Sequence, residues 1–208
     1  MNHQKTEVEY KWKLPSQKTE RKVLATLKSL GAKIMPEKKV RIHDYYVETA
    51  GRLFSKKKIT CRLRQINHTW QITMKRSRKL KHGLATRFEK TIRMPATGNK
   101  KQASQFFTKQ ILVPLFGKTA WLVQFEVLNR RTVQKVAIQG KFVGELSFDH
   151  TRIKKKSRSF GYNEIEFEFL KGNRQSFYSI CRILTRRAKL QHVQHSKVAT
   201  AHRVFRLN

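Results

Sequence analysis

The sequence predicts an α+β fold in which many antiparallel strands carry a few helices on the outside. Most of the chain alternates side-chain character residue by residue, as strands with two different faces do. Turn signals separate several of these runs, including Asn67-His68 and Gly140-Lys141. Only three segments show helical spacing of apolar residues. We expect a single domain over residues 1–208.

The first strand is expected from Glu7 to Leu14. Its apolar face carries Val8, Tyr10 and Trp12, and its charged face carries Glu7, Glu9 and Lys11. A helix of about four turns should follow between Ser16, a favourable N-cap, and Gly31, a favourable C-terminal residue. Its apolar positions are Val23, Leu24, Leu27 and Leu30.

The remaining elements are mostly strands. Strands are expected at 39–48, 59–66, 69–76, 85–94, 120–131, 133–140, 142–153 and 162–170. The basic run from Lys154 to Arg158 is expected in a loop that ends at Gly161. Residues 101–113 and 174–190 have helical spacing.

The charge balance is strongly basic. The chain has 47 Lys and Arg residues against 13 Asp and Glu residues, a formal net charge of +34. Such a chain repels itself unless polyanions neutralise it, so a phosphate-rich partner is expected. A host whose proteins are generally basic is the alternative explanation.

Two cysteines, Cys61 and Cys181, stand far apart and show neither a disulfide framework nor zinc-site spacing. A cytoplasmic location is therefore expected. The first residues contain no apolar signal-like core, and no run approaches the roughly 18 apolar residues of a membrane span. We expect a soluble protein that is neither exported nor embedded in a membrane.

The placement of the scarce carboxylates is informative. Glu164, Glu166 and Glu168 share one face of a late strand, where three negative charges would repel one another. A divalent metal ion, or inward-facing Arg and Lys side chains, would supply the compensating charge. Further carboxylates lie on other strands: Glu7 and Glu9, Glu89, and Asp149.

Basic residues show the same pattern. Arg62 and Arg64 flank Leu63, Lys75 follows Thr73 on one face, and Arg87 shares a face with Glu89. The pair Arg130-Arg131 ends another predicted strand, and only one of the two can face inward without a bulge. Each motif alone is an ordinary solvated strand face. Their joint occurrence across at least five strands favours one shared interior, if the strands close into a barrel.

A triphosphate fits such an interior. It needs several Arg and Lys donors, together with Mg²⁺ or Mn²⁺ on carboxylates, to neutralise its charge during transfer. Phosphoryl or nucleotidyl transfer is therefore the expected chemistry.

Several motifs together resemble the CYTH superfamily, which includes thiamine and inorganic triphosphatases, class IV adenylyl cyclases and, more distantly, fungal-type RNA triphosphatases. The resembling segments are EVEYK, Leu-Gly-Ala at 30–32, DYYVET at 44–49 with Glu48 in place of an Asp, CRLR, TMK, RFE, EIEFE and HSKVATA. The resemblance implies a closed antiparallel β-barrel of about eight strands, a tunnel with flanking helices.

The resemblance also implies site residues. The expected metal-holding and acidic residues are Glu7, Glu9, Glu89, Asp149, Glu164, Glu166 and Glu168. The expected phosphate-binding residues are Lys11, Arg62, Arg64, Lys75, Arg87, Arg130 or Arg131, and Lys197. Among these residues, the expected catalytic ones are Glu7, Glu9, Lys11, Glu164 and Glu166. The expected cofactor is Mg²⁺ or Mn²⁺.

The leading functional hypothesis is hydrolysis of tripolyphosphate, thiamine triphosphate or a nucleoside triphosphate. Three alternatives stay open: cyclisation of ATP, removal of the terminal phosphate from RNA 5′-triphosphate ends, and binding of polyphosphate or nucleic acid without turnover. The basic runs at 56–58, 75–81 and 154–156 favour a nucleic-acid contact. The sequence does not distinguish a monomer from a homodimer.

Overall fold

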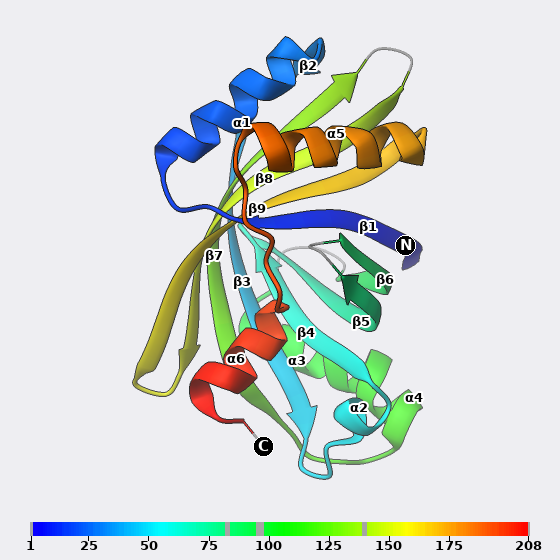
Figure 1. Ribbon diagram of the computed structural model, residues 1–208. Helices are drawn as coiled ribbons and strands as arrows, with labels where there is room; N and C mark the ends of the chain where they lie inside the picture. Colours follow the sequence, from blue (N-terminus) through cyan, green and yellow to red (C-terminus); the bar gives the residue numbers. More distant parts are fainter. Residues whose placement is uncertain (1, 82–83, 95–97, 139–140, 208) are drawn as a thin grey trace.

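The computed structural model describes residues 2–81, 84–94, 98–138 and 141–207, with side chains described at all of these except 2–5, 77–81 and 85–87. Within these ranges, nine strands form one antiparallel sheet with helices around it (Figure 1). The predicted α+β class is confirmed.

The strands are long because the period-two pattern continues through most of them. Their bounds are β1 Asn2–Lys13, β2 Ala32–Ile34, β3 Lys38–Thr49, β4 Ile59–Ile66, β5 Thr69–Lys81, β6 Leu84–Arg93, β7 Trp121–Ile138, β8 Phe142–Lys155 and β9 Arg158–Gly172.

Eight of these strands close into a barrel. The sheet order is β2-β7-β3-β4-β5-β6-β1-β9-β8, and an additional pairing of β7 with β8 joins the two ends. The short strand β2 pairs only with β7 and lies outside the ring. Closure removes the exposed sheet edges that would otherwise invite aggregation. The expected closed barrel of about eight strands is confirmed.

Seven helical segments lie around or against the barrel in the described part of the chain. Their bounds are α1 Gln17–Ser29, α2 Leu53–Lys56, α3 Lys100–Phe107, the π-helical segment η1 Thr108–Leu112, α4 Val113–Phe116, α5 Arg174–Arg187 and α6 Lys197–Phe205. Figure 1 shows α1 and α5 at one end of the molecule and the α3–α4 segment at the other.

The apolar faces of the strands point outward and are covered by helices. Trp12 of β1 is fully buried beneath α5, where its Nε1 donates a hydrogen bond to Thr185 Oγ1 at 2.9 Å. Phe177 and Leu184 of α5 and Leu27 of α1 belong to the same hydrophobic cluster. Burial of these side chains outside the barrel leaves the charged faces for the inside.

A second cluster lies under the α3–α4 segment. Trp70 and Ile72 of β5 pack there with Phe107 and Leu112. Helix α6 differs from the other helices because it packs against the inner face of β3 and β7. Its residues Ala201 and Phe205 lie in a third cluster with Tyr46, Phe125, Val127 and Ile153. The C-terminal helix therefore fills part of the barrel.

Two sequence predictions were wrong in detail. Residues 120–131 and 133–140 were expected as two strands, but β7 is continuous from Trp121 to Ile138. No Gly or Pro interrupts this stretch, so one strand pairs with β3 and β8 at once. The basic run from Lys154 to Arg158 is not a long loop, because β8 and β9 extend to Lys155 and Arg158 and meet in a tight turn with Lys156 at φ 53°.

The sequence did not predict β2, α2 or α6. Each is too short for a clear periodic pattern. The backbone N–H groups of Phe54 and Ser55 in α2 donate to the Glu48 carboxylate at 3.0 and 2.9 Å. The expected turn residue Gly140 lies outside the described residues.

Both cysteines are free and buried, in agreement with the expected lack of a disulfide framework. Across the described ranges, no helix has the length and apolar character needed to cross a bilayer.

A buried ion pair fixes the β3–β4 register. Asp44 lies directly opposite Arg64, whose Nε and Nη2 donate to its two oxygens at 2.6 and 2.8 Å, and Arg62 Nη1 lies 3.3 Å away. Burial alone would raise the pKa of Asp44, but the two guanidinium groups outweigh burial and lower this pKa to about 2. The ionised carboxylate therefore stabilises the folded state.

We predict that Asp44→Asn lowers the free energy of unfolding by an amount that depends on pH. The folded pKa lies below the unfolded value, so the contribution of Asp44 is complete above about pH 4 and disappears as the pH falls toward about 2. This pH-dependent part should be about 2 kcal/mol in urea unfolding experiments. Glu37→Gln is the control, because Glu37 is half exposed and only 3.6 Å from exposed Lys39. A constant difference between parent and Asp44→Asn across this range would contradict the assignment.

Candidate active site

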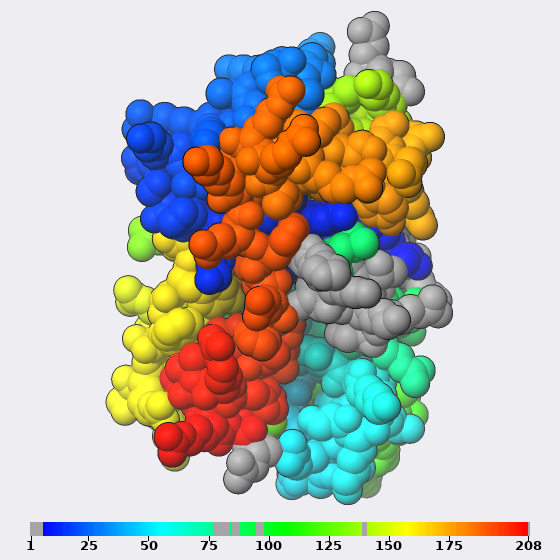
Figure 2. Space-filling view, in the orientation of Figure 1, coloured from blue at the N-terminus to red at the C-terminus, as the bar shows by residue number. Residues whose placement is uncertain are grey.

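The interior of the barrel is a narrow charged tunnel. Charged side chains from β1, β4, β5, β7 and β9 and from the start of α6 line it, and they leave only about 80 Å³ of free space. Figure 2 shows the C-terminal segment, orange to red, running across the front of the barrel over this interior. The tunnel arises because strand alternation places the acidic and basic residues of β1, β4, β5 and β9 at every second position, on the inner side of the barrel.

Three carboxylates cluster at one point of the tunnel wall. Asp149 of β8 lies directly opposite Glu164 of β9, and Glu166 is the next inward residue on β9. One oxygen from each lies within 4.8 Å of the others. All three are buried, with side-chain exposures of 0, 2 and 10%.

Basic side chains surround this three-carboxylate cluster. Lys197 Nζ lies 3.2 Å from Asp149 and 3.0 Å from Glu166, and it also contacts Glu164. Arg131 donates two hydrogen bonds of 2.6 Å to Asp149 and contacts Glu166. Lys197 is placed by helix α6, whose N-cap Ser196 accepts a hydrogen bond from the backbone of Ala199. Lys197 and Arg131 together therefore offset much of the negative charge of the cluster.

A second network spans β1, β5 and β6. Lys75 Nζ lies 2.8 Å from Glu7 and 2.6 Å from Glu89. Lys11, on the same face of β1, lies 3.3 Å from Glu9 and contacts Glu166 of the three-carboxylate cluster. The charged face of β1 therefore bridges the two halves of the tunnel.

The electrostatic environment keeps most of this network ionised. Burial opposes the charge on Glu166, but Lys11, Lys197 and Arg131 outweigh it and hold the pKa of Glu166 well below its usual range. Glu164 differs, because burial dominates and raises its pKa despite the nearby lysines. The pKa of Lys197 lies well above its usual range because the three carboxylates outweigh its burial.

Among the described side chains, the tunnel holds more negative than positive ones, although the chain as a whole is strongly basic. The acidic residues in these contacts or on the tunnel wall are Glu7, Glu9, Asp44, Glu89, Asp149, Glu164, Glu166 and Glu168. The basic ones among the described side chains are Lys11, Arg62, Arg64, Lys75, Arg131 and Lys197. Among the described side chains, eight carboxylates are thus inside, against six Lys and Arg residues.

The structure brings most of the sequence-predicted site residues together. Arg131 faces the tunnel, whereas Arg130 is exposed on the opposite face of β7. Glu168 is half-buried and lines the tunnel. The backbone of Arg87 lies opposite Glu7 in the β1–β6 register, but its side chain lies outside the described side chains.

Two tunnel residues were missed as site residues. Asp44 and Tyr46 lie within the DYYVET segment but were given no role. The Tyr46 hydroxyl accepts a hydrogen bond from Arg62 Nη1 at 3.3 Å. Asp44 and Tyr46 orient Arg62 and Arg64 across the pairing of β3 with β4. The sequence alone does not show this, because the contacting residues lie on different strands and form no local motif.

The donor set of the three-carboxylate cluster fits a hard divalent cation such as Mg²⁺ or Mn²⁺, which prefers oxygen ligands. Among the described residues, no other group of three potential ligand side chains comes this close together. The other residues expected to hold metal also lie in the tunnel: Glu7 and Glu89 beside Lys75, Glu9 beside Lys11, and Glu168 in the lining.

Solved structures share this fold at low sequence identity. HpAC1 from Hippeastrum, described as a candidate adenylyl cyclase with a dominant triphosphatase activity, has a TM-score of 0.65 at 16% identity, over 97% of each chain. A candidate adenylate cyclase from Bacillus halodurans has a TM-score of 0.57 at 18% identity, over 94% of this chain and 96% of the other. The RNA triphosphatase domain of the mimivirus mRNA capping enzyme has a TM-score of 0.52 at 8% identity, over 88% and 89%.

A comparison with curated protein sequences finds no match. The sequence model of the CYTH domain, in contrast, matches residues 5–201. This range runs from within β1 to within α6 and includes all the other strands of the barrel. With a match over nearly the whole length, this chain belongs to the CYTH domain family.

Proposed function

We propose that this protein is a divalent-metal-dependent triphosphatase that hydrolyses a triphosphate inside the tunnel. The observation that carries the proposal is the three-carboxylate cluster within the same enclosed space as six Lys and Arg side chains. A simple anion-binding site would not need an excess of buried carboxylates, because they repel phosphate. Carboxylates and cations together suit a substrate that arrives with metal.

The basic residues would hold the phosphates. Arg62 and Arg64 lie on β4, Lys75 lies on the neighbouring strand β5, and Arg131 lies on β7, which only β3 separates from β4. One guanidinium group can donate two parallel hydrogen bonds to phosphate oxygens. Its positive charge would stabilise the negative charge that develops on the equatorial oxygens of the transferred phosphoryl group. Asp44 and Tyr46 would keep Arg62 and Arg64 in place through the contacts described above.

Asp149, Glu164 and Glu166 would hold the metal. When bound there, a divalent ion supplies positive charge to the phosphate oxygens. In hydrolysis, a water oxygen bonds to the terminal phosphorus while the bond from that phosphorus to the bridging oxygen breaks. Glu7 or Glu9 would orient this water and accept its proton, and Lys11 beside Glu9 would stabilise the leaving diphosphate.

The fold neighbours include proteins described as cyclases as well as triphosphatases. Cyclisation of ATP would use the same tunnel, with a ribose hydroxyl in place of water and pyrophosphate as the leaving group. Product analysis separates the two reactions, because only cyclisation yields cyclic AMP.

We predict metal-dependent release of phosphate from tripolyphosphate, thiamine triphosphate, ATP or 5′-triphosphate RNA. Chelation should abolish turnover, and Glu166→Gln and Arg64→Ala should each lower kcat by about 10²- to 10³-fold. Glu37→Gln, on the exposed surface, should match the parent. If folded Glu166→Gln and Arg64→Ala hydrolysed every substrate at the parental rate, the proposed site would be wrong.

We also predict that Lys197→Met binds Mn²⁺ about tenfold more tightly than the parent, because the ammonium group competes with metal for the three carboxylates. Electron paramagnetic resonance of free and bound Mn²⁺ measures this directly, without substrate. Lys75→Met is the matched control, since its partners are Glu7 and Glu89. An increase in both variants, or in neither, would argue against metal binding at the three-carboxylate cluster.

A further inference from the structure

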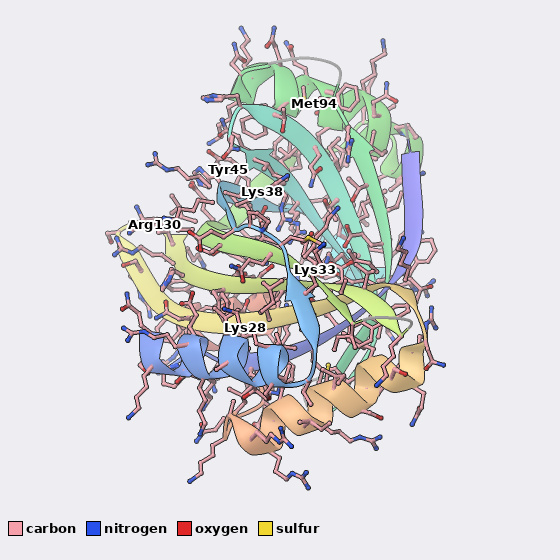
Figure 3. The ribbon with its side chains drawn as sticks, turned by 90° about the horizontal axis from the view of Figure 1, so that it is seen from above. Lys28, Lys33, Lys38, Tyr45, Met94 and Arg130 are labelled. Atoms are coloured by element: carbon pink, nitrogen blue, oxygen red, sulfur yellow. The ribbon has the colours of Figure 1, made fainter. Side chains whose placement is uncertain are left out.

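A second concave surface lies on the outside of the barrel, on strands β3, β7, β8 and β9. It is a groove of about 910 Å³, and we call it the outer groove. Its Arg, Lys and His lining residues are Arg41, His43, Arg130, His150, Arg152 and Lys154. None of them belongs to the hydrophobic clusters that the helices cover. Figure 3 shows Arg130 at the periphery of the ribbon.

The cations of the outer groove face one another across the strands. Arg41 of β3 lies directly opposite Arg130 of β7, and Arg130 lies directly opposite His150 of β8. Arg152 and Lys154 continue this face along β8, and both are exposed. Like charges at directly opposite positions destabilise a sheet. This arrangement therefore calls for an anion to bridge the strands.

The outer groove differs from the tunnel in its charge balance. In the tunnel every described cation has carboxylates nearby, whereas no Asp or Glu is among the described residues that line the outer groove. Two acidic residues lie at its margin. Glu126 lies 2.7 Å from His43 Nε2 and directly opposite Lys154 in the β7–β8 register, and Glu20 of α1 interacts with His150. A triphosphate with its metal suits the tunnel. A long polyanion without metal suits the outer groove.

The polar residues between the cations favour a nucleic acid over inorganic polyphosphate. Gln65, Asn67 and Asn163 line the same groove, and amide side chains hydrogen-bond to base edges and to ribose 2′-hydroxyls. Arg152 and Lys154 are two residues apart on one strand, or roughly 6.6 Å. This spacing follows the phosphates of an extended single strand better than the closely joined phosphates of a polyphosphate.

We propose that the outer groove binds single-stranded RNA through its phosphate backbone, separately from the chemistry in the tunnel. Arg41, Arg130, Arg152 and Lys154 would contact phosphates, and the amide side chains would contact ribose and base groups. This inference goes beyond the proposed hydrolysis and does not depend on it.

The test is fluorescence anisotropy with a short labelled RNA that carries a 5′-hydroxyl, so that no triphosphate end can enter the tunnel. The double variant Arg41→Ala with Arg152→Ala should weaken binding about tenfold and reduce the slope of log affinity against log salt by about 1.4. The matched control is Arg182→Ala with Arg186→Ala, which removes two exposed arginines from α5. The control should retain nearly parental affinity and slope.

Three results would overturn the proposal. If both double variants bound RNA equally weakly, only the net charge of the protein would matter. If the groove variant bound RNA as tightly as the parent, RNA would bind at another surface. The third result concerns inorganic polyphosphate and single-stranded DNA. If either bound the parent more tightly than RNA does, and the groove variant lost that binding but kept RNA binding, the groove would have another occupant. The groove variant should unfold at the parental temperature or slightly above it, because it loses the like-charge pair of Arg41 and Arg130. Its tripolyphosphate hydrolysis should match the parent, because Arg41 and Arg152 lie outside the tunnel.

Discussion

The structure depends on the pairing of opposite charges inside the barrel. Removing one ion from water costs several kcal/mol, and a buried charge left without a partner destabilises a fold strongly. Each strand register must therefore bring acids and bases together, as Asp44 and Arg64 show across β3 and β4, and Arg131 and Asp149 across β7 and β8. A slip of one residue would turn these side chains outward and bring the apolar ones in.

This charged interior inverts the usual arrangement of a small barrel. The apolar strand faces point outward, so they need helices to cover them. Helices α1 and α5 bury Trp12, Phe148 and Phe167, and the α3–α4 segment buries Trp70 and Ile72. The outer face that carries Arg41 and Arg130 has no such apolar character, and it carries the outer groove. Strand alternation thus explains both why helices cover the apolar outer faces and why the charged outer face stays exposed.

Strand alternation also explains how much the sequence could predict. The period-two pattern correctly predicted which faces of β1 and β9 carry carboxylates, because alternation is local. The pattern could not decide whether Arg130 or Arg131 faces inward, because a bulge anywhere in β7 exchanges the inward and outward positions beyond it. The contacts of Arg131 with Asp149 and Glu166 show that Arg131 faces inward. The pattern missed the role of Asp44 because the partners Arg62 and Arg64 lie on another strand. It also missed α6, which has nine residues and whose amphipathic face meets the inside of the barrel.

Under the proposed function, the same pairing links metal binding to substrate binding. A metal ion on Asp149, Glu164 and Glu166 would displace Lys197 and leave a buried ammonium group without its partners. A triphosphate that bound Arg131 and Lys197 would likewise remove these two cationic partners from the three carboxylates. Each ligand alone therefore creates a buried charge that the other would neutralise, and their binding free energies must be coupled. The ion-paired tunnel then favours the metal and the triphosphate together over either one alone.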